Sequence, residues 1–149
     1  MTISVATHFG GFGDVMLPML QQAAPDAEFV GAPAPADVLV MLLHDRPDVA
    51  PMLEGVRWVH VLGAGVDGFP LDRLGDRVLT CSRGASAPAI AEFVLATMLA
   101  FEKHLPDVWI DAPPPRWNTG ALGGLRRRTA GIVGLGSIGL EVARRALAF

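Results

Sequence analysis

Residues 131–149, GIVGLGSIGLEVARRALAF, constrain the fold of this chain more than any other stretch. They place the pattern G-x-G-x-x-G between a short apolar run and an amphipathic helical pattern, with its glycines at Gly134, Gly136 and Gly139. In a strand–turn–helix unit the first glycine allows a tight turn, the second lets the backbone approach a pyrophosphate, and the third lets the helix pack closely on the strand. The free N–H groups and partial positive charge of the helix N-terminus favour the same anion. This context predicts dinucleotide binding, with a chance glycine turn as the alternative.

Upstream of this motif, short apolar runs alternate with helical or loop segments. The runs cover residues 2–9, 27–31, 37–43, 57–63 and 77–82, and helices are expected at 14–25 and 86–104. Hydrophobic residues make up 51% of the chain, and the run DVLVMLL at 37–43 is apolar almost throughout, as strands buried on both faces are. The alternation predicts an α/β fold with a parallel sheet of about five strands, in which the run 37–43 does not lie at an exposed edge.

The amino-acid composition changes after the second predicted helix. Apolar residues of that helix, among them Ile90, Phe93 and Phe101, repeat at helical spacing and form one broad stripe. Three consecutive prolines at 113–115, followed by glycines, are typical of an extended connector. We therefore expect a domain boundary near residues 98–105. Residues 1–100 would form one domain, and 101–149 would hold the end of the helix, the linker and the first strand and helix of a nucleotide-binding domain.

One strand and one helix cannot form a sheet by themselves. We therefore expect the chain to be part of a longer protein, or residues 112–149 to be supported by a second copy or to be disordered.

Composition excludes several classes of protein. The net charge of −3 offers no general footprint for nucleic acid. The most apolar segment, 89–101, contains Glu92 and is too short to cross a bilayer, and the N-terminus lacks the pattern of a signal peptide. The single cysteine, Cys81, cannot form an internal disulfide and is interpreted as a small apolar filler. We expect a cytoplasmic protein with no nucleic-acid or membrane partner, and the histidines show no metal-binding spacing.

Two loops follow predicted strands at their carboxyl ends, where open α/β sheets bind ligands. The loop GAGVD at 63–67 can offer main-chain N–H groups to an anion, although a purely structural turn is equally consistent with it. Asp67 could bind a ligand, but in a glycine turn it more often bonds its own backbone. His44 and Asp45 could form an acid–base pair, but a surface loop lining a cleft is the favoured interpretation.

Charged residues elsewhere are interpreted structurally. Glu92 stands on an otherwise apolar helix face, where its carboxylate must meet a donor or a solvated cleft. The run Arg126–Arg128 is interpreted as a solvated linker rather than a phosphate patch.

Three stretches in this order and at this spacing resemble the D-2-hydroxyacid dehydrogenase family, which is NAD(P)-dependent. They are WVHVLGAGVD, RGASAPAIAEFVLATMLAF and LRRRTAGIVGLGSIGLEVARRALAF. The resemblance extends from about Asp37 to Phe149, and residues 1–36 match only in pattern. It implies a flavodoxin-like substrate domain, a long interdomain helix, a Rossmann domain and a later return of the chain to the first domain. It also implies hydride transfer between the nicotinamide of NAD or NADP and C2 of a 2-oxo or 2-hydroxy acid, in a homodimer.

The resemblance assigns roles to two sets of residues. The substrate set is Ala64, Gly65, Val66, Ala85 and Ser86, in which the N–H groups of Gly65 and Val66 hold the carboxylate. The cofactor set is Gly134, Gly136, Ser137, Ile138 and Gly139, in which Ser137 and Ile138 donate N–H groups to the pyrophosphate.

The chain also departs from the family pattern. The family's catalytic Arg, Glu and His belong to positions that this sequence does not contain, so no catalytic residue is assigned and the chain alone is expected to be inactive. The acidic residue that reads the ribose lies about 20 residues past the glycines, beyond Phe149, so the sequence does not distinguish NAD from NADP. The alternatives are a non-enzymatic NAD(H)-binding sensor, as in corepressors of this fold, and a short protein that only binds or dimerises.

Overall fold

The computed structural model describes residues 2–43, 47–113, 115–116 and 122–149. The chain divides into two compact units, Met1–Arg83 and Gly84–Phe149. The long helix predicted at 86–104 is present as α2 (Ala87–Glu102) and lies wholly in the second unit. The domain boundary expected near residues 98–105 stays a prediction.

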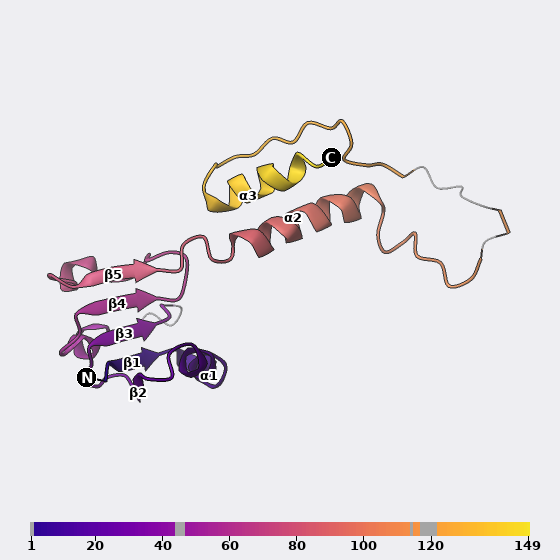
Figure 1. Ribbon diagram of the computed structural model, residues 1–149. Helices are drawn as coiled ribbons and strands as arrows, with labels where there is room; N and C mark the ends of the chain where they lie inside the picture. The colour runs from indigo at the N-terminus through magenta and orange to yellow at the C-terminus, as the bar shows by residue number, and fades with distance from the viewer. Residues whose placement is uncertain (1, 44–46, 114, 117–121) are drawn as a thin grey trace. The chain divides into compact units, whose positions relative to one another are not determined.

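The first unit contains a parallel sheet with the strand order β2-β1-β3-β4-β5 (Figure 1). Its strands are β1 (Ser4–His8), β2 (Glu28–Gly31), β3 (Val38–Met41), β4 (Trp58–Val61) and β5 (Val78–Cys81). All four pairings are parallel. The flavodoxin-like α/β fold is therefore confirmed. The run 37–43 supplies the central strand, which agrees with the expectation that it does not lie at an exposed edge.

Alternate side chains of the strands build two cores on opposite faces of the sheet. On one face, Val5 and Val40 pack against helix α1 (Gly13–Ala23). On the other face, Leu39, Met41 and Val59 pack against residues of the 3-10 turn η2 (Ala50–Leu53). Short 3-10 turns, η1 (Gly10–Phe12) and η3 (Leu71–Arg73), complete the unit. Among the described residues, the connection from β1 to β2 is the one between strands that contains an α-helix.

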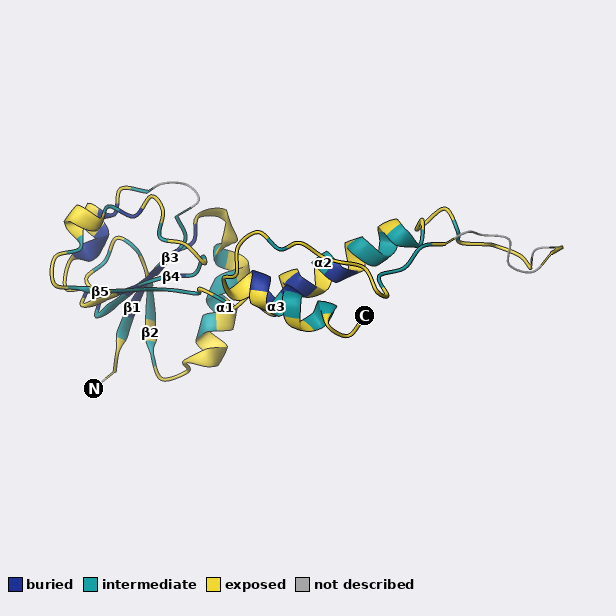
Figure 2. Cartoon of the chain, turned by 90° about the horizontal axis from the view of Figure 1, so that it is seen from above, coloured by how far each residue is buried: buried dark blue, intermediate teal, exposed yellow. Residues whose placement is uncertain are grey.

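The second unit pairs α2 with α3 (Ser137–Ala146), and its small core lies between them (Figure 2). Ala91, Leu95 and Val142 are buried there, and Ile132 packs against them. The Glu92 side chain is 71% exposed to solvent, and its Oε1 also lies 3.6 Å from Arg145 Nη2. Hydrogen bonds from Arg145 and then Arg144 hold the pKa of the Glu141 carboxyl below its usual value.

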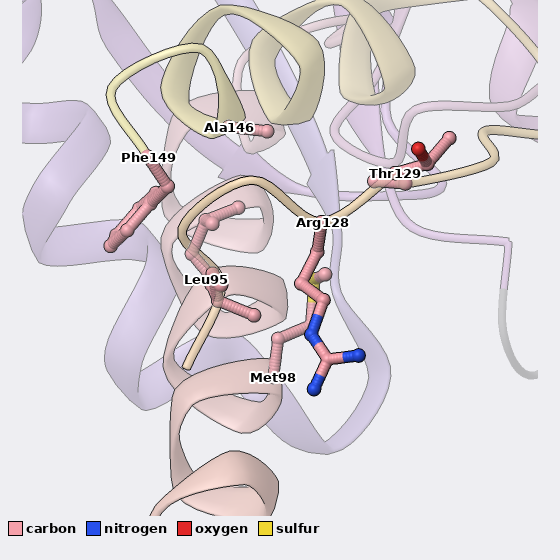
Figure 3. Close-up of a pocket in the computed structure, with 8 residues that line it drawn as sticks. Leu95, Met98, Arg128, Thr129, Ala146 and Phe149 are labelled. Carbon is pink, nitrogen blue, oxygen red and sulfur yellow. The ribbon is translucent and has the colours of Figure 1, made fainter. Parts of the chain in front are cut away.

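A small cavity of about 70 Å³ lies beside this core. Phe149 and Arg128 lie on opposite sides of it in Figure 3. It is lined by Leu95, Met98, Leu125, Arg128, Thr129, Ala130, Ala146 and Phe149. Because an apolar cavity needs roughly 150 Å³ to hold even a benzene ring, we interpret this one as imperfect packing between α2, α3 and the segment before α3.

The structure differs from the sequence prediction at residues 130–134. This segment was expected to be a strand, but among the described residues no strand pairs with it, and it is not a β-strand. Ile132 packs on the second core, whereas Val133 is fully exposed. The physical reason is that a strand is defined by its ladder, and this unit supplies no second strand.

Two kinds of feature are absent from the described residues. None of the helices there is long and apolar enough to cross a membrane. That part of the chain also contains no group of three or more His, Cys, Asp or Glu side chains that could hold a metal ion.

Candidate functional site

The three glycines of the G-x-G-x-x-G turn have the geometry that the motif requires. Gly134 has φ +95°, a left-handed backbone conformation that residues other than glycine adopt only under strain. A Cβ on Gly139 would lie 2.0 Å from the Gly134 carbonyl oxygen, so the helix and the turn are too close for any residue but glycine at position 139. A Cβ on Gly136 would meet nothing within 4 Å, and the backbone there is open to a ligand.

The first helical turn of α3 has backbone N–H donors without an acceptor, next to the glycine turn. The Leu140 N–H donates to the Gly136 carbonyl at 3.0 Å and begins the helical ladder. Among the described residues, the N–H groups of Ser137, Ile138 and Gly139 donate to no protein acceptor, and no side chain caps the helix. Free N–H groups and the helix dipole together form an anion site. The structure thus brings all five predicted cofactor residues into one turn.

The segment before α2 lies against the same turn within the second unit. Gly84 has φ +88°, and a Cβ added there would lie 3.3 Å from Ser137 Oγ. Ala85 and Ser86, both predicted to bind substrate, follow Gly84 directly, and Ser86 is the N-cap residue of α2 without a capping side-chain bond. The sequence did not indicate this proximity, because the two segments are separated by about fifty positions.

In the first unit, the end of β5 holds the glycine loop that follows β4. The Ser82 N–H donates to the Gly63 carbonyl at 3.0 Å, and the Cys81 thiol donates to the Ala64 carbonyl at 3.4 Å. Farther along, the Phe69 N–H donates to the Val66 carbonyl at 2.9 Å. The N–H groups of Gly65 and Val66 have no acceptor in the described part of the chain. The loop is therefore anchored by its carbonyl groups and keeps two donors for an anion.

Asp67 lies next to these two donors. Its Oδ2 would be 2.7 Å from a Cβ on Gly65, and its side chain accepts no hydrogen bond from the loop among the described residues. The expected bond to its own backbone is therefore not formed. A carboxylate at this position repels an anion bound to the loop.

The remaining candidates have structural roles or lie outside the described residues. Cys81 packs partly buried against the core of the first unit, as a small apolar filler would. The side chains of Arg126–Arg128 are exposed, which agrees with a solvated linker. His44 and Asp45 lie outside the described residues.

Sequence reasoning missed a hydrogen-bonded group of side chains on β4 and β5. Trp58 Nε1 donates to Thr80 Oγ1 at 2.7 Å, and Thr80 Oγ1 lies 2.8 Å from His60 Nδ1. His60 Nε2 lies 3.2 Å from Ser82 Oγ. The available signal was the alternation of positions 58 and 60 with 80 and 82 on two strands that pair in register.

Several known proteins are similar to this chain in sequence. No family model matches the chain. It is 39% identical over 92 residues to hydroxypyruvate reductase of Thermotoga maritima, which covers 58% of this chain and 30% of that protein. It is 28% identical over 120 residues to D-3-phosphoglycerate dehydrogenase of Methanocaldococcus jannaschii, covering 76% of this chain and 23% of that protein. The chain thus spans less than a third of the curated relatives that it matches.

Solved structures share the fold across almost the whole chain. D-lactate dehydrogenase of Aquifex aeolicus, complexed with NAD and lactic acid, has a TM-score of 0.65 and 22% identity, covering 97% of this chain and 48% of that one. The NADPH-dependent glyoxylate/hydroxypyruvate reductase of Sinorhizobium meliloti, in complex with NADP and malonate, has a TM-score of 0.63 and 21% identity, covering 99% and 51%.

The sheet order and the glycine turn define an α/β protein with a doubly wound, flavodoxin-like sheet. Within that class, the similar proteins include a hydroxypyruvate reductase, a D-3-phosphoglycerate dehydrogenase and a D-lactate dehydrogenase, which confirms the resemblance to the D-2-hydroxyacid dehydrogenase family predicted from the sequence.

Proposed function

We propose that this chain is the N-terminal part of an NAD(P)-dependent oxidoreductase that transfers a hydride between the nicotinamide and C2 of a 2-oxo or 2-hydroxy acid. The observation that carries the proposal is the turn from Gly134 to Gly139, which opens onto three unused N–H groups of α3. The cofactor supplies the hydride, and the chain's own residues bind and orient. Solved neighbours that contain NAD and NADP support either nucleotide as the cofactor.

Substrate binding is assigned to the loop after β4. The N–H groups of Gly65 and Val66 are its free donors, and a carboxylate is the anion that a 2-hydroxy acid would present to them. Ala64 completes this loop, and Ala85 and Ser86 are proposed as further substrate contacts. Glycine at residue 65 leaves room for the neighbouring carboxylate, because a Cβ there would lie 2.7 Å from Asp67 Oδ2.

The test of this function is turnover by the complete protein. With NADH or NADPH as hydride donor and glyoxylate, hydroxypyruvate or pyruvate as acceptor, loss of absorbance at 340 nm is expected for at least one combination. The alternative, a non-enzymatic sensor, binds NADH and turns over none of these acids. Tight NADH binding without any turnover would therefore contradict the proposed enzyme and favour the non-enzymatic sensor.

The isolated chain of 149 residues is expected to have no dehydrogenase activity. Hydride transfer needs a proton donor for the forming alkoxide and a cation for the carboxylate. No residue of this chain matches the Arg, Glu or His that perform these tasks in the family. The measurement is NADH oxidation with the same acids by a preparation of verified mass, and turnover above a heat-inactivated control would contradict the expectation.

Replacing Asp67 by asparagine is expected to strengthen binding of glycolate at the loop about fivefold. The substitution removes a like charge close to the bound carboxylate, and two unit charges about 4 Å apart in water interact by about 1 kcal/mol. The measurement is a titration that follows the Gly65 and Val66 amide signals. Asp26→Asn is the matched control, because Asp26 is an exposed carboxylate just before β2, at the opposite edge of the sheet. Equal affinities for the three proteins would show that Asp67 does not face the anion.

We also propose a homodimer in the cytoplasm. The exposed face of α2 supports the dimer, because Phe93 and Phe101 are 69% and 80% exposed on one helix. Sedimentation is expected to give twice the mass of one chain, and the double substitution of Phe93→Ser and Phe101→Ser is expected to give monomers.

The free thiol of Cys81 is consistent with the proposed cytoplasmic location, which is a reducing compartment.

A further inference from the structure

Four side chains form a continuous row of hydrogen bonds along one face of β4 and β5. Trp58 and His60 alternate on β4, so both point to the same face of the sheet. Thr80 on β5 pairs in register with His60, and Ser82 follows two positions later, just beyond the strand. The order of contacts is Trp58, Thr80, His60 and Ser82.

The distances within this row favour one direction for its hydrogen bonds. The indole of Trp58 can only donate, so Thr80 Oγ1 accepts its proton and has one proton left to give. His60 Nδ1 at 2.8 Å is a nearer acceptor for that proton than the Val59 carbonyl at 3.5 Å. A neutral imidazole that accepts at Nδ1 carries its hydrogen on Nε2. Nε2–H then donates to Ser82 Oγ, which leaves the hydroxyl hydrogen of Ser82 unused.

The last member of the row, Ser82, has its backbone next to the start of the proposed carboxylate loop. Ser82 is half-buried at the carboxyl edge of the sheet, and its N–H donates to the Gly63 carbonyl where the loop begins. In the described part of the chain no acceptor takes the Ser82 hydroxyl hydrogen. A hydroxyl that already accepts a hydrogen bond is a stronger donor to the next acceptor.

We propose that the Ser82 hydroxyl donates a third hydrogen bond to the carboxylate held by the N–H groups of Gly65 and Val66. His60 is then a positioning residue, because it fixes the direction of that hydroxyl through the row from Trp58 and Thr80. This inference rests on the proposed function, since it needs a substrate carboxylate at the loop. A third donor would also offset the repulsion from Asp67.

The direction of the row is tested without any ligand. Long-range ¹H–¹⁵N correlation on the chain is expected to show neutral His60 with its hydrogen on Nε2. Thr80→Val removes the hydroxyl and should abolish this preference, whereas Thr80→Ser keeps the hydroxyl and should preserve it. A hydrogen on Nδ1 in the parent chain would overturn the proposed direction.

The donor role of Ser82 is tested with glycolate, the simplest 2-hydroxy acid. Following the Gly65 and Val66 amides, we expect Ser82→Ala to weaken binding about tenfold, the effect of losing a hydrogen bond to a charged group. Ser82→Thr keeps the hydroxyl and should retain most of the affinity. Thr97→Ala, which removes an exposed hydroxyl from α2, is the matched control and should change nothing.

The role of His60 is tested by coupling. His60→Phe alone should weaken glycolate binding several-fold, but should have no further effect in the Ser82→Ala background. Amide dispersion of the five strands serves as the folding control for each variant. If the parent binds glycolate and Ser82→Ala binds it equally well, the inference is wrong and the proposed function stands. If glycolate leaves the Gly65 and Val66 amides of the parent unshifted, the substrate assignment of the loop is wrong, and the role of Ser82 with it.

Discussion

Gly139→Ala is expected to disrupt the packing of α3 on the turn before it. Inside a helix this substitution normally stabilises by roughly 0.5–1 kcal/mol. Here the new Cβ would lie 2.0 Å from the Gly134 carbonyl oxygen and 3.3 Å from Ile132 Cγ2. Because the nearer atom is backbone, the helix must move away, which should cost about 1–3 kcal/mol or more and reverse the usual sign. The measurement is amide exchange in α3, where protection should be lost.

Gly136→Ala is the matched control for this substitution. It makes the same chemical change three residues earlier, where a Cβ meets nothing within 4 Å. Its effect on the protection of α3 should be small, but a methyl group at the open backbone should prevent approach of a pyrophosphate. Unchanged or increased protection of α3 in Gly139→Ala would contradict the close contact between helix and turn.

Leu39→Ala is expected to destabilise the first unit by about 2–5 kcal/mol. Leu39 is 0% exposed in the central strand β3, where the surrounding core cannot collapse fully onto the space left behind. A loss of this size is a large part of the 5–15 kcal/mol that typically stabilises a native protein. The measurement is the free energy of unfolding in urea, followed by the circular dichroism signal.

Leu71→Ala provides the comparison within the same unit. Leu71 lies on η3 with 60% of its surface exposed, so the same substitution should change the free energy of unfolding by less than about 0.5 kcal/mol. Equal losses for the two variants would show that β3 is not the centre of the core.

Much of the first unit could be predicted because its signals are local. A strand buried on both faces must be apolar almost throughout, and for that reason the run 37–43 was expected away from an exposed edge of the sheet. The connections between strands were harder to predict, because the segment before β4 forms a 3-10 turn at Ala50–Leu53 instead of a longer α-helix. Short segments with several prolines lack the length that an α-helix needs to be stable.

The second unit shows where periodicity stops being informative. The stripe that includes Ile90, Phe93 and Phe101 was evident from the sequence, yet these three residues are exposed. The buried face of α2 is instead Ala87, Ala91 and Leu95. Helical spacing shows which residues share a face, but the neighbouring element decides which face is buried, and small residues let α3 approach closely.

By itself, the sequence determined the alternation of strands, the glycine turn and the reason for each of its glycines, because these depend on residues that are neighbours along the chain. Only the tertiary structure decided what meets across longer separations. It placed Gly84 against Ser137 and linked His60 to Thr80 and Ser82. Among the described residues, it also gave residues 130–134 no strand to pair with, although their composition is that of a strand. Hydrogen bonds between distant residues depend on register and packing, which no single segment encodes.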